Sequence, residues 1–433
     1  MCAGCSEGDA GVIRTPWEAH VNDSPTAPVT AAESPPSGGR VPFLDVARAL
    51  AMIGVVLMNA PTVVFAAERV GERAPDLVTS VVDTALSVLM SGKARALLMV
   101  LLGAGAVFAW RAAARRGGGP LVLMLRRYLV LGVLFGAPHL WVFSGDILTH
   151  YALTALVLAP LMPLLLAGSR ARPLYAAAAA FALAPVVDAF APQTHELAVV
   201  VVLVPQTLGF FCVGVWLARR LESGPDAPPG GPSRLPLRLV VLGLGGQVLG
   251  MVTMFAADLF FPLELDADGV PVGLGPDGMP PREPGSDMLV SMGGALMGLG
   301  GALFYLGLVW WVMNRGRTSA RVLTGLAPLG RMTLTAYLGS TLVFLVVMGP
   351  FEGEVPLLAQ YGLAMAYFVV VALAARWWAR RFRLGPLEWV WRSLTLLRPV
   401  PMRLPADDAP PAVPARPARL TETGSGRTDA PHM

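Results

Sequence analysis

The fold is decided by two apolar runs that meet within residues 134–153, LFGAPHLWVFSGDILTHYAL. Apolar residues continue on both sides of a short turn at 144–145 for about 20 positions, the length that a helix needs to cross the hydrocarbon core of a bilayer. Three ionisable side chains, His139, Asp146 and His150, lie inside these runs. Ionisable groups in lipid cost free energy unless they are paired or hydrated, so this stretch is a candidate functional site.

The whole chain has the same apolar character as this stretch. Of its 433 residues, 55% are hydrophobic and 14% are charged, which is far from the composition of a soluble domain. The apolar runs are continuous and rich in Leu, Val and Ala, which favours helices over the alternating strands of an outer-membrane barrel. We therefore predict an all-α, polytopic transmembrane helix bundle.

Ten spans are expected, or eleven if residues 76–91 also cross the membrane. The segment 76–91, DLVTSVVDTALSVLMS, is shorter than a span and carries Asp76 and Asp83, which favours an interfacial or re-entrant helix. The ten spans are expected at residues 43–65, 94–114, 122–143, 146–168, 173–190, 197–218, 237–261, 288–313, 322–347 and 357–377.

The two ends of the chain differ from the spans in composition. Residues 1–40 and 399–433 are rich in Pro, Ala and charged residues and have no apolar periodicity, which predicts disordered tails around a transmembrane domain at 41–398. Arginines cluster in alternate loops, and the positive-inside rule assigns such loops to the cytoplasm. With ten spans, both tails are expected in the cytoplasm, and the protein is expected in the cell membrane as a multi-pass protein.

Several classes of function are disfavoured by the residue pattern. The net charge of +4 comes from basic residues scattered over the loops, so nucleic acid is not an expected partner. The three cysteines have no zinc-ligand spacing, and no metal is expected. Nucleotide-binding P-loops, zinc-protease motifs and serine-hydrolase motifs are also absent from the sequence.

Three polar residues are expected near the outer membrane surface. The turn at 144–145 places His139 and Asp146 on adjacent spans, and Asn59 lies near the same end of the first span. Structural roles remain open for all three: a core histidine bonded to another helix, a helix N-cap for Asp146, and a bond between helices for Asn59. His150 lies four residues after Asp146 and could pair with it.

Further positions have mainly structural interpretations. Asp45 and Arg48 are three residues apart at the cytoplasmic end of the first span, which favours an ion pair, although Arg48 could instead bind a phosphate. Glu388, in the C-terminal GPLEWVWRSLT, is expected to pair with a basic residue inside an amphipathic anchor. Glycines such as Gly103 and Gly293 are expected to permit close helix contacts.

Four stretches together resemble a known family in their order and spacing. They are RVPFLDVARALAMIGVVLMN, RRYLVLGVLFGAPHLWVFSGDILTHYAL, LGRMTLTAYLGS and RLGPLEWVWRSLT. They are similar to the YeiB-like family of bacterial membrane proteins, domain of unknown function 418. The chain departs from the family pattern at Ala49, Ala336 and Ser340, so we assign no substrate contact to residues 331–341.

The chain also resembles, more distantly, the transmembrane acyltransferases of the heparan glucosaminide N-acetyltransferase group. Their first span similarly ends in an asparagine, at the position of Asn59. The resemblance implies transfer of an acyl group from cytoplasmic acyl-CoA to a glycan or small-molecule acceptor at the outer face. His139 would then be a general base, Asp146 would orient its imidazole, and Asn59 would donate a hydrogen bond to the oxyanion.

The same resemblance implies a donor site at the inner mouth of the bundle. Arg48, with Arg126 and Arg127, would hold the phosphates of acyl-CoA. Two other functions stay open: a proton-coupled secondary transporter, in which His139 and Asp146 relay a proton, and a non-catalytic membrane protein. The sequence has no clear internal repeat of the kind that transporters often carry.

Overall fold

The computed structural model describes residues 41–64, 76–190, 200–223, 234–262, 283–351 and 355–404. The N-terminal tail predicted at 1–40 lies outside these residues, as does the C-terminal tail beyond 404. Residues 399–404 are described, and they hydrogen-bond to the chain near Arg381 and Arg383 through backbone groups of Met402 and Leu404.

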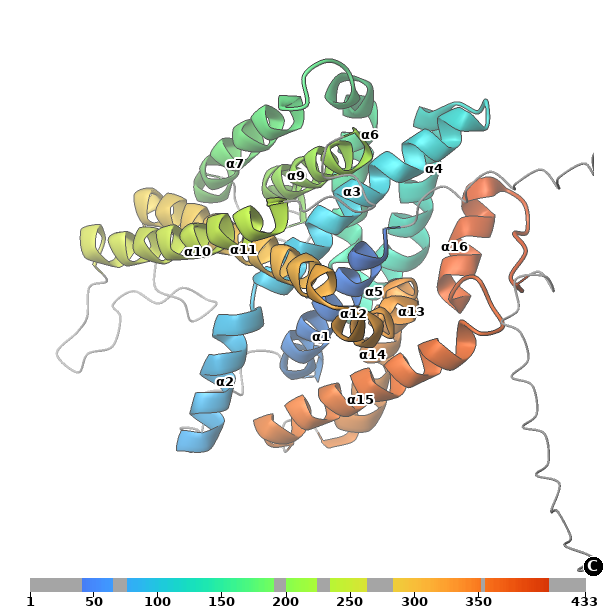
Figure 1. Cartoon of the computed structure of the whole chain (residues 1–433). Helices are drawn as coiled ribbons and strands as arrows, with labels where there is room; N and C mark the ends of the chain where they lie inside the picture. The colour runs from blue at the N-terminus through green and yellow to red at the C-terminus, as the bar shows by residue number, and fades with distance from the viewer. Residues whose placement is uncertain are drawn as a thin grey trace, which may run out of the picture. The chain divides into compact units, whose positions relative to one another are not determined.

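The regular structure of the described residues is helical (Figure 1). In chain order, the elements are α1 (Pro42–Val64), α2 (Leu77–Met90), α3 (Lys93–Arg115), α4 (Pro120–Val130), the π-helix η2 (Leu131–Gly136), α5 (Ala137–Val142), α6 (Leu148–Leu166), α7 (Arg172–Phe190), α9 (Val204–Ser223), α10 (Leu235–Phe260), α11 (Pro284–Arg315), α12 (Arg317–Thr324), α13 (Ala327–Gly330), α14 (Thr333–Met348), the 3₁₀-helix η3 (Gly349–Phe351), α15 (Leu357–Trp378) and α16 (Pro386–Leu396).

Ten helical segments of the described chain are long and apolar enough to cross a bilayer. The predicted all-α, polytopic fold is thus confirmed, and the chain is an integral, multi-pass membrane protein. Many large apolar side chains remain exposed on these helices, for example Leu242, Val248 and Phe255 on α10. In a membrane these side chains face lipid, which is as apolar as they are.

The ninth span begins later than predicted. The sequence predicts one helix over 322–347, but residues 317–330 form the short helices α12 and α13, and the span starts at Thr333 in α14. Gly330 explains part of the interruption, because a Cβ there would overlap the backbone of Asp45 in α1. The chain turns at this contact before it enters the span.

Helix α2 adds no separate span to the ten. A turn at Ser91 and Gly92 joins it to α3, and the two together form one candidate segment, Leu77–Arg115. Helix α3 alone has 23 residues, which is enough to cross the membrane. None of the side chains of α2 is buried, and the helix is held by hydrogen bonds from Tyr361 to Asp83, 2.5 Å, and from Tyr305 to the carbonyl of Leu89, 2.5 Å.

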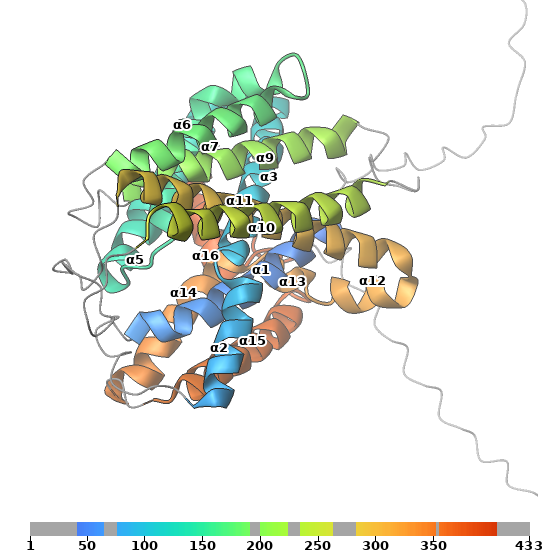
Figure 2. The same cartoon turned by 90° about the vertical axis from the view of Figure 1, so that its left-hand side faces the viewer.

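Glycines bring two pairs of helices into backbone contact, as the sequence predicts. A Cβ at Gly103 of α3 would overlap the backbone of Phe211 in α9. A Cβ at Gly293 of α11 would lie 2.9 Å from the carbonyl oxygen of Gly250 in α10. Helices α10 and α11 accordingly run side by side (Figure 2). Gly294, by contrast, has open space where a Cβ would stand.

Candidate functional site

The candidate site is positioned by an irregular turn of helix in the third span. Pro138 lies in the first turn of α5, and a proline ring clashes with the carbonyl four residues earlier in a regular α-helix. The preceding residues form the π-helix η2, a form that is frequent at functional sites. Gly136, at its end, packs so closely on α6 that a Cβ would lie 2.8 Å from the hydroxyl of Thr149. This contact holds His139 against the start of α6.

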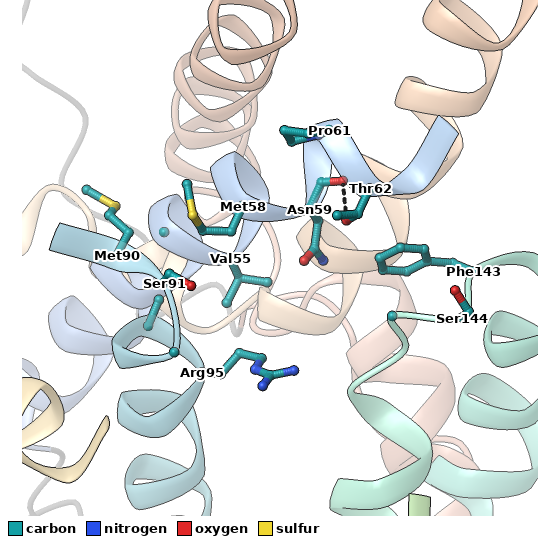
Figure 3. Close-up of a pocket in the computed structure, with 14 residues that line it drawn as sticks. Val55, Met58, Asn59, Pro61, Thr62, Met90, Ser91, Arg95, Phe143 and Ser144 are labelled. Atoms are coloured by element: carbon teal, nitrogen blue, oxygen red, sulfur yellow. Dashed lines mark hydrogen bonds between the residues drawn. The ribbon is translucent and has the colours of Figure 1, made fainter. Parts of the chain in front are cut away.

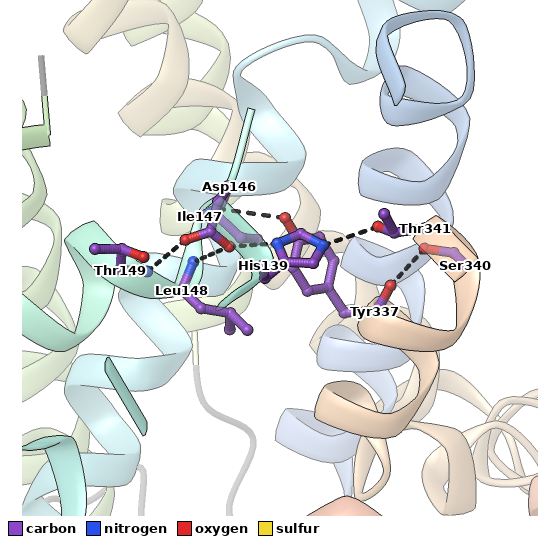
Figure 4. A network of polar contacts seen from close by, with 8 residues as sticks. All are labelled: His139, Asp146, Ile147, Leu148, Thr149, Tyr337, Ser340 and Thr341. Carbon is purple, nitrogen blue, oxygen red and sulfur yellow. Dashed lines mark hydrogen bonds and ion pairs between the residues drawn. The ribbon is translucent and has the colours of Figure 1, made fainter. Parts of the chain in front are cut away.

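The structure brings His139 and Asp146 together as a buried pair (Figure 4). His139 Nδ1 lies 2.6 Å from Asp146 Oδ1, and the two residues are 6% and 5% exposed. Asp146 also accepts hydrogen bonds from the backbone N–H groups of Leu148, at 3.0 Å, and Thr149, at 2.7 Å. Asp146, one residue before the N-cap position at Ile147, therefore accepts from the free N–H groups at the start of α6 and is the partner of His139 at the same time.

The hydrogen bonds around Asp146 decide its charge. Burial alone would raise the pKa of this carboxyl, but the hydrogen bonds from His139, Thr149 and Leu148 outweigh burial and lower the pKa. Asp146 is therefore ionised at neutral pH, and an ionised carboxylate only accepts hydrogen bonds. It follows that His139 Nδ1 carries the proton of this hydrogen bond, so that Nε2 is the ring nitrogen on the far side from the carboxylate.

A hydroxyl group lies against that nitrogen. His139 Nε2 is 3.0 Å from Thr341 Oγ1, which comes from α14. Tyr337, one turn earlier on α14, places its ring 4.9 Å from the imidazole, and its Oη accepts a hydrogen bond from the backbone N–H of Ile147. The site thus links three segments of the chain by the series Asp146, His139 and Thr341.

Asn59 does not contact His139 but lines a neighbouring cavity of about 620 Å³ (Figure 3). Its amide nitrogen Nδ2 is buried and has no hydrogen-bond partner among the described residues. Phe143 also lines this cavity, and its ring packs edge-on against His139 with 5.7 Å between the ring centroids. Phe143 thus contacts His139 and lines the same cavity as Asn59.

His150 interacts with Asp146 electrostatically and through a hydrogen bond to its backbone. The side-chain ion pair of Asp146 among the described residues is with His139. His150 is buried to 2% exposure and packs edge-on against Tyr151, with 4.6 Å between the ring centroids. In the described part of the chain, no group of three or more His, Cys, Asp or Glu side chains could hold a metal ion.

The arginines proposed for the donor site lie on α1 and α4. Arg48 pairs with Asp45 at 3.3 Å, as predicted, and donates to the carbonyl of Leu101 at 3.1 Å. The guanidinium of Arg127 lies 3.9 Å from the ring centre of Trp391 and interacts electrostatically with Arg48. The Nε atoms of Arg126 and Arg127 are buried without a hydrogen-bond partner among the described residues.

Glu388 has a different partner from the basic residue that the sequence predicts. Its carboxylate accepts hydrogen bonds from the backbone N–H of Leu334, at 2.7 Å, and from both the N–H and the hydroxyl of Thr335. It thus caps the N-terminus of α14 by accepting from free N–H groups of its first turn. Burial is the main effect on this carboxyl, and it raises the pKa of Glu388.

Three residues near the site have no functional role in the sequence interpretation. Thr341 and Tyr337 stand at the His139 ring, and Arg95 lines the cavity. The motif LGRMTLTAYLGS, which ends one residue before Thr341, is the sequence feature that marks α14. Its departures from the family pattern are the reason why the sequence assigns it no substrate contact. No sequence feature marks Arg95 as a binding residue, because an arginine at the end of a span usually reflects the orientation of the helix in the membrane.

Fold and site together define a polytopic helical membrane protein with a buried His–Asp pair beside a cavity. Residues 273–398 match the model of the family described as protein of unknown function, DUF418. The resemblance to this family is thus confirmed over α11 to α16, the part that carries Tyr337, Thr341 and Glu388.

Two curated relatives match short parts of the chain. The chain is 31% identical over 103 residues to an uncharacterized 39.9 kDa protein in the amylase 3' region of Bacillus acidopullulyticus, which is 23% of this chain and 30% of the relative. It is 32% identical over 98 residues to the uncharacterized protein YxaH of Bacillus subtilis, which is 22% of this chain and 24% of the relative. The matches thus span less than a third of either relative. No solved structure matches the chain.

Proposed function

We propose that the protein is a membrane acyltransferase, which moves an acyl group from acyl-CoA on the predicted cytoplasmic side to an acceptor on the opposite side. The observation that carries this proposal is the buried pair of His139 and Asp146, in which Nε2 faces a hydroxyl group at 3.0 Å. A histidine held in this tautomer by a carboxylate is a general base for acyl transfer.

The reaction needs one proton transfer in each direction. His139 Nε2 takes the proton from the acceptor hydroxyl or amine as its oxygen or nitrogen attacks the thioester carbonyl. Asp146, which accepts from Nδ1 at 2.6 Å, stabilises the imidazolium that forms. The tetrahedral intermediate then breaks its C–S bond, and the CoA thiolate leaves and takes the proton from His139.

Asn59 is the proposed donor to the oxyanion. Its buried Nδ2 has no partner among the described residues, so it is free to donate to the negative oxygen of the intermediate. Phe143 lines the same cavity as this amide and packs against His139. In the proposal, the ring of Phe143 turns away when the acceptor binds, and Asn59 and His139 then act on the same carbonyl group.

The donor end of the site lies farther along α1. Arg48 and Asn59 are eleven residues apart, which corresponds to about 16 Å along a helix. Arg48 and Arg127 interact with each other, and Arg48 also pairs with Asp45. Guanidinium groups are well suited to hold phosphates such as those of CoA.

Proton-coupled transport is the second candidate, favoured by the π-helix η2 directly before His139. Helices interrupted within the membrane are common in secondary transporters. In this alternative, His139 and Asp146 would relay a proton across the membrane, and no acyl donor would be needed. Proteoliposomes with a pH-sensitive dye would then show proton flux in the absence of acyl-CoA, which the transferase proposal does not expect.

The test of the transferase uses the full chain in nanodiscs. Acetyl-CoA should raise the melting temperature saturably in the wild type and in His139→Gln, but not in Arg48→Ala. With glucosamine as probe acceptor, release of the free CoA thiol should be lost in His139→Gln and kept in His150→Gln, a matched change of a buried histidine outside the pair. Binding that survives Arg48→Ala, or thiol release that survives His139→Gln, would refute these roles.

A further inference from the structure

The cavity beside the His–Asp pair has a charged side chain in its lining. It lies where the end of α1, the turn between α2 and α3, and the loop before α6 meet, and its volume is about 620 Å³ (Figure 3). Arg95, from the first turns of α3, is the one ionisable side chain among the described residues that line it. The described lining therefore carries a positive charge with no acid to balance it.

Arg95 is free to bind a ligand. None of the described residues forms an ion pair with its guanidinium, and the side chain is exposed rather than buried in protein. Its backbone is fixed, because the hydroxyl of Tyr151 donates to the carbonyl oxygen of Arg95 at 3.2 Å. A guanidinium on a fixed backbone presents two parallel N–H groups to a carboxylate or phosphate.

A second, independent donor points into the same cavity. The amide of Asn59 and the side chain of Arg95 lie on opposite sides of the space in Figure 3, and Asn59 Nδ2 has no partner among the described residues. A buried donor without a partner costs free energy, so such a group is expected to meet an acceptor on a ligand. Ser91 and Ser144 add hydroxyl groups to the lining.

The rest of the lining is apolar and limits the kind of ligand. Val55, Met58, Met90 and Phe143 contribute aliphatic, thioether and aromatic surface. Methionine side chains adapt to ligands of varied shape. A small inorganic ion would leave this surface uncovered, whereas an organic molecule with one anionic group would use both parts of the cavity.

We propose that this cavity binds the acceptor and that the acceptor is an organic anion, whose carboxylate or phosphate group is held by Arg95, on the opposite side of the cavity from Asn59. Its role as acceptor site rests on the proposed function; its selectivity for anions does not. The anionic group would sit at Arg95, and the body of the molecule would lie along Met58 and Phe143 toward the His–Asp pair.

Binding of a matched pair of sugars tests the proposal. The full chain is placed in nanodiscs of phosphatidylcholine, and its melting temperature is followed with glucuronate, inorganic phosphate and neutral glucose. Glucuronate should raise the melting temperature saturably and glucose should not. Loss of the guanidinium in Arg95→Gln should weaken glucuronate binding about tenfold to a hundredfold, the range for a charge-assisted hydrogen bond. Arg95→Lys, which keeps the positive charge, should lose less of the affinity for glucuronate.

Two controls keep the result interpretable. Arg115→Gln removes an exposed arginine from the other end of the same helix and should leave binding unchanged. Asn59→Asp keeps the side-chain shape but adds a negative charge inside the cavity, so it should repel glucuronate even if Arg95→Gln fails to fold. Equal binding of glucose and glucuronate, no binding of either anion, or full binding in Arg95→Gln and Asn59→Asp would overturn the proposal.

The remaining outcomes separate this proposal from its alternatives. Nanodiscs that contain phosphatidylglycerol should still permit glucuronate binding; if they abolish it, a lipid headgroup occupies the cavity and the acceptor assignment is wrong. Glucuronate binding without any thiol release from acetyl-CoA would refute the transferase but leave the anion site standing. Thiol release with glucosamine 6-phosphate, an acceptor that carries a phosphate, that is indifferent to Arg95→Gln would refute the anionic acceptor while the transferase stands.

Discussion

Replacement of Asp146 by Asn tests the double role of this carboxylate in depth. Three N–H donors meet it: His139 Nδ1 and Leu148 N at Oδ1, and Thr149 N at Oδ2. An asparagine has one acceptor oxygen, so in either orientation its NH₂ group faces at least one of these donors. At least one hydrogen bond to a charged group is lost, which costs about 1.5–3 kcal/mol.

The assay is thermal unfolding of the full chain in nanodiscs. For a chain of this size, a loss of that magnitude corresponds to a fall in melting temperature of roughly 2–3 °C at pH 7. Asp258→Asn is the matched control, because Asp258 is exposed on α10. Exposed substitutions of this kind change the free energy of unfolding by less than about 0.5 kcal/mol.

The pH dependence of the difference adds an internal check. Hydrogen bonds lower the pKa of Asp146 in the folded protein, so its contribution to stability is present above the unfolded pKa, about 3.9. That contribution is lost as the pH falls through the lower, folded pKa. The gap between wild type and Asp146→Asn should therefore narrow in acid. A wild-type melting temperature for the variant at pH 7, or a gap that does not narrow, would refute the reasoning.

Two further changes test other parts of the structure. Gly103→Ala should lower the free energy of unfolding by about 1–3 kcal/mol, because its Cβ overlaps the backbone of Phe211. The control Gly245→Ala, whose Cβ meets nothing within 4 Å, should be neutral or stabilising. Equal melting temperatures of the two variants would contradict the close α3–α9 contact. Burial raises the pKa of Glu388, so the neutral form is favoured on folding and stability from this group is lost as pH rises through the folded pKa. Glu388→Gln should therefore melt no lower than wild type at pH 7, and the two melting temperatures should converge near pH 4. Glu388→Ala leaves the N–H groups of Leu334 and Thr335 without an acceptor, so its free energy of unfolding should fall by about 1–3 kcal/mol. A Glu388→Gln variant as unstable as Glu388→Ala would contradict this prediction.

The sequence predicts most of the span positions because the bilayer imposes a fixed length and an apolar surface on each helix. It fails at 322–347, where hydropathy stays high but Gly330 packs on the backbone of Asp45 and the chain forms α12 and α13 instead. Hydropathy reports how apolar a residue is and carries no information about which backbone lies against it.

The candidate site shows the same division between local and tertiary information. Seven residues of chain and one turn separate His139 from Asp146, so their pairing follows from local geometry and could be predicted. Thr341 lies 202 residues from His139 along the chain, and Arg95 meets Asn59 at the cavity only because α1 and α3 are packed together. No periodicity in the sequence encodes such distant contacts.

The sequence by itself thus determined the class of protein and a count of ten or eleven spans, and it named His139 and Asp146 as candidates, because these depend on composition and on neighbours within one helical hairpin. Only the tertiary structure decided that Thr341 lies against Nε2 of His139, that Asn59 and Phe143 line one cavity, and that Glu388 caps a helix instead of pairing with a cation. The physical reason is that packing between helices selects one partner among many chemically acceptable ones, and that selection depends on where every other helix lies.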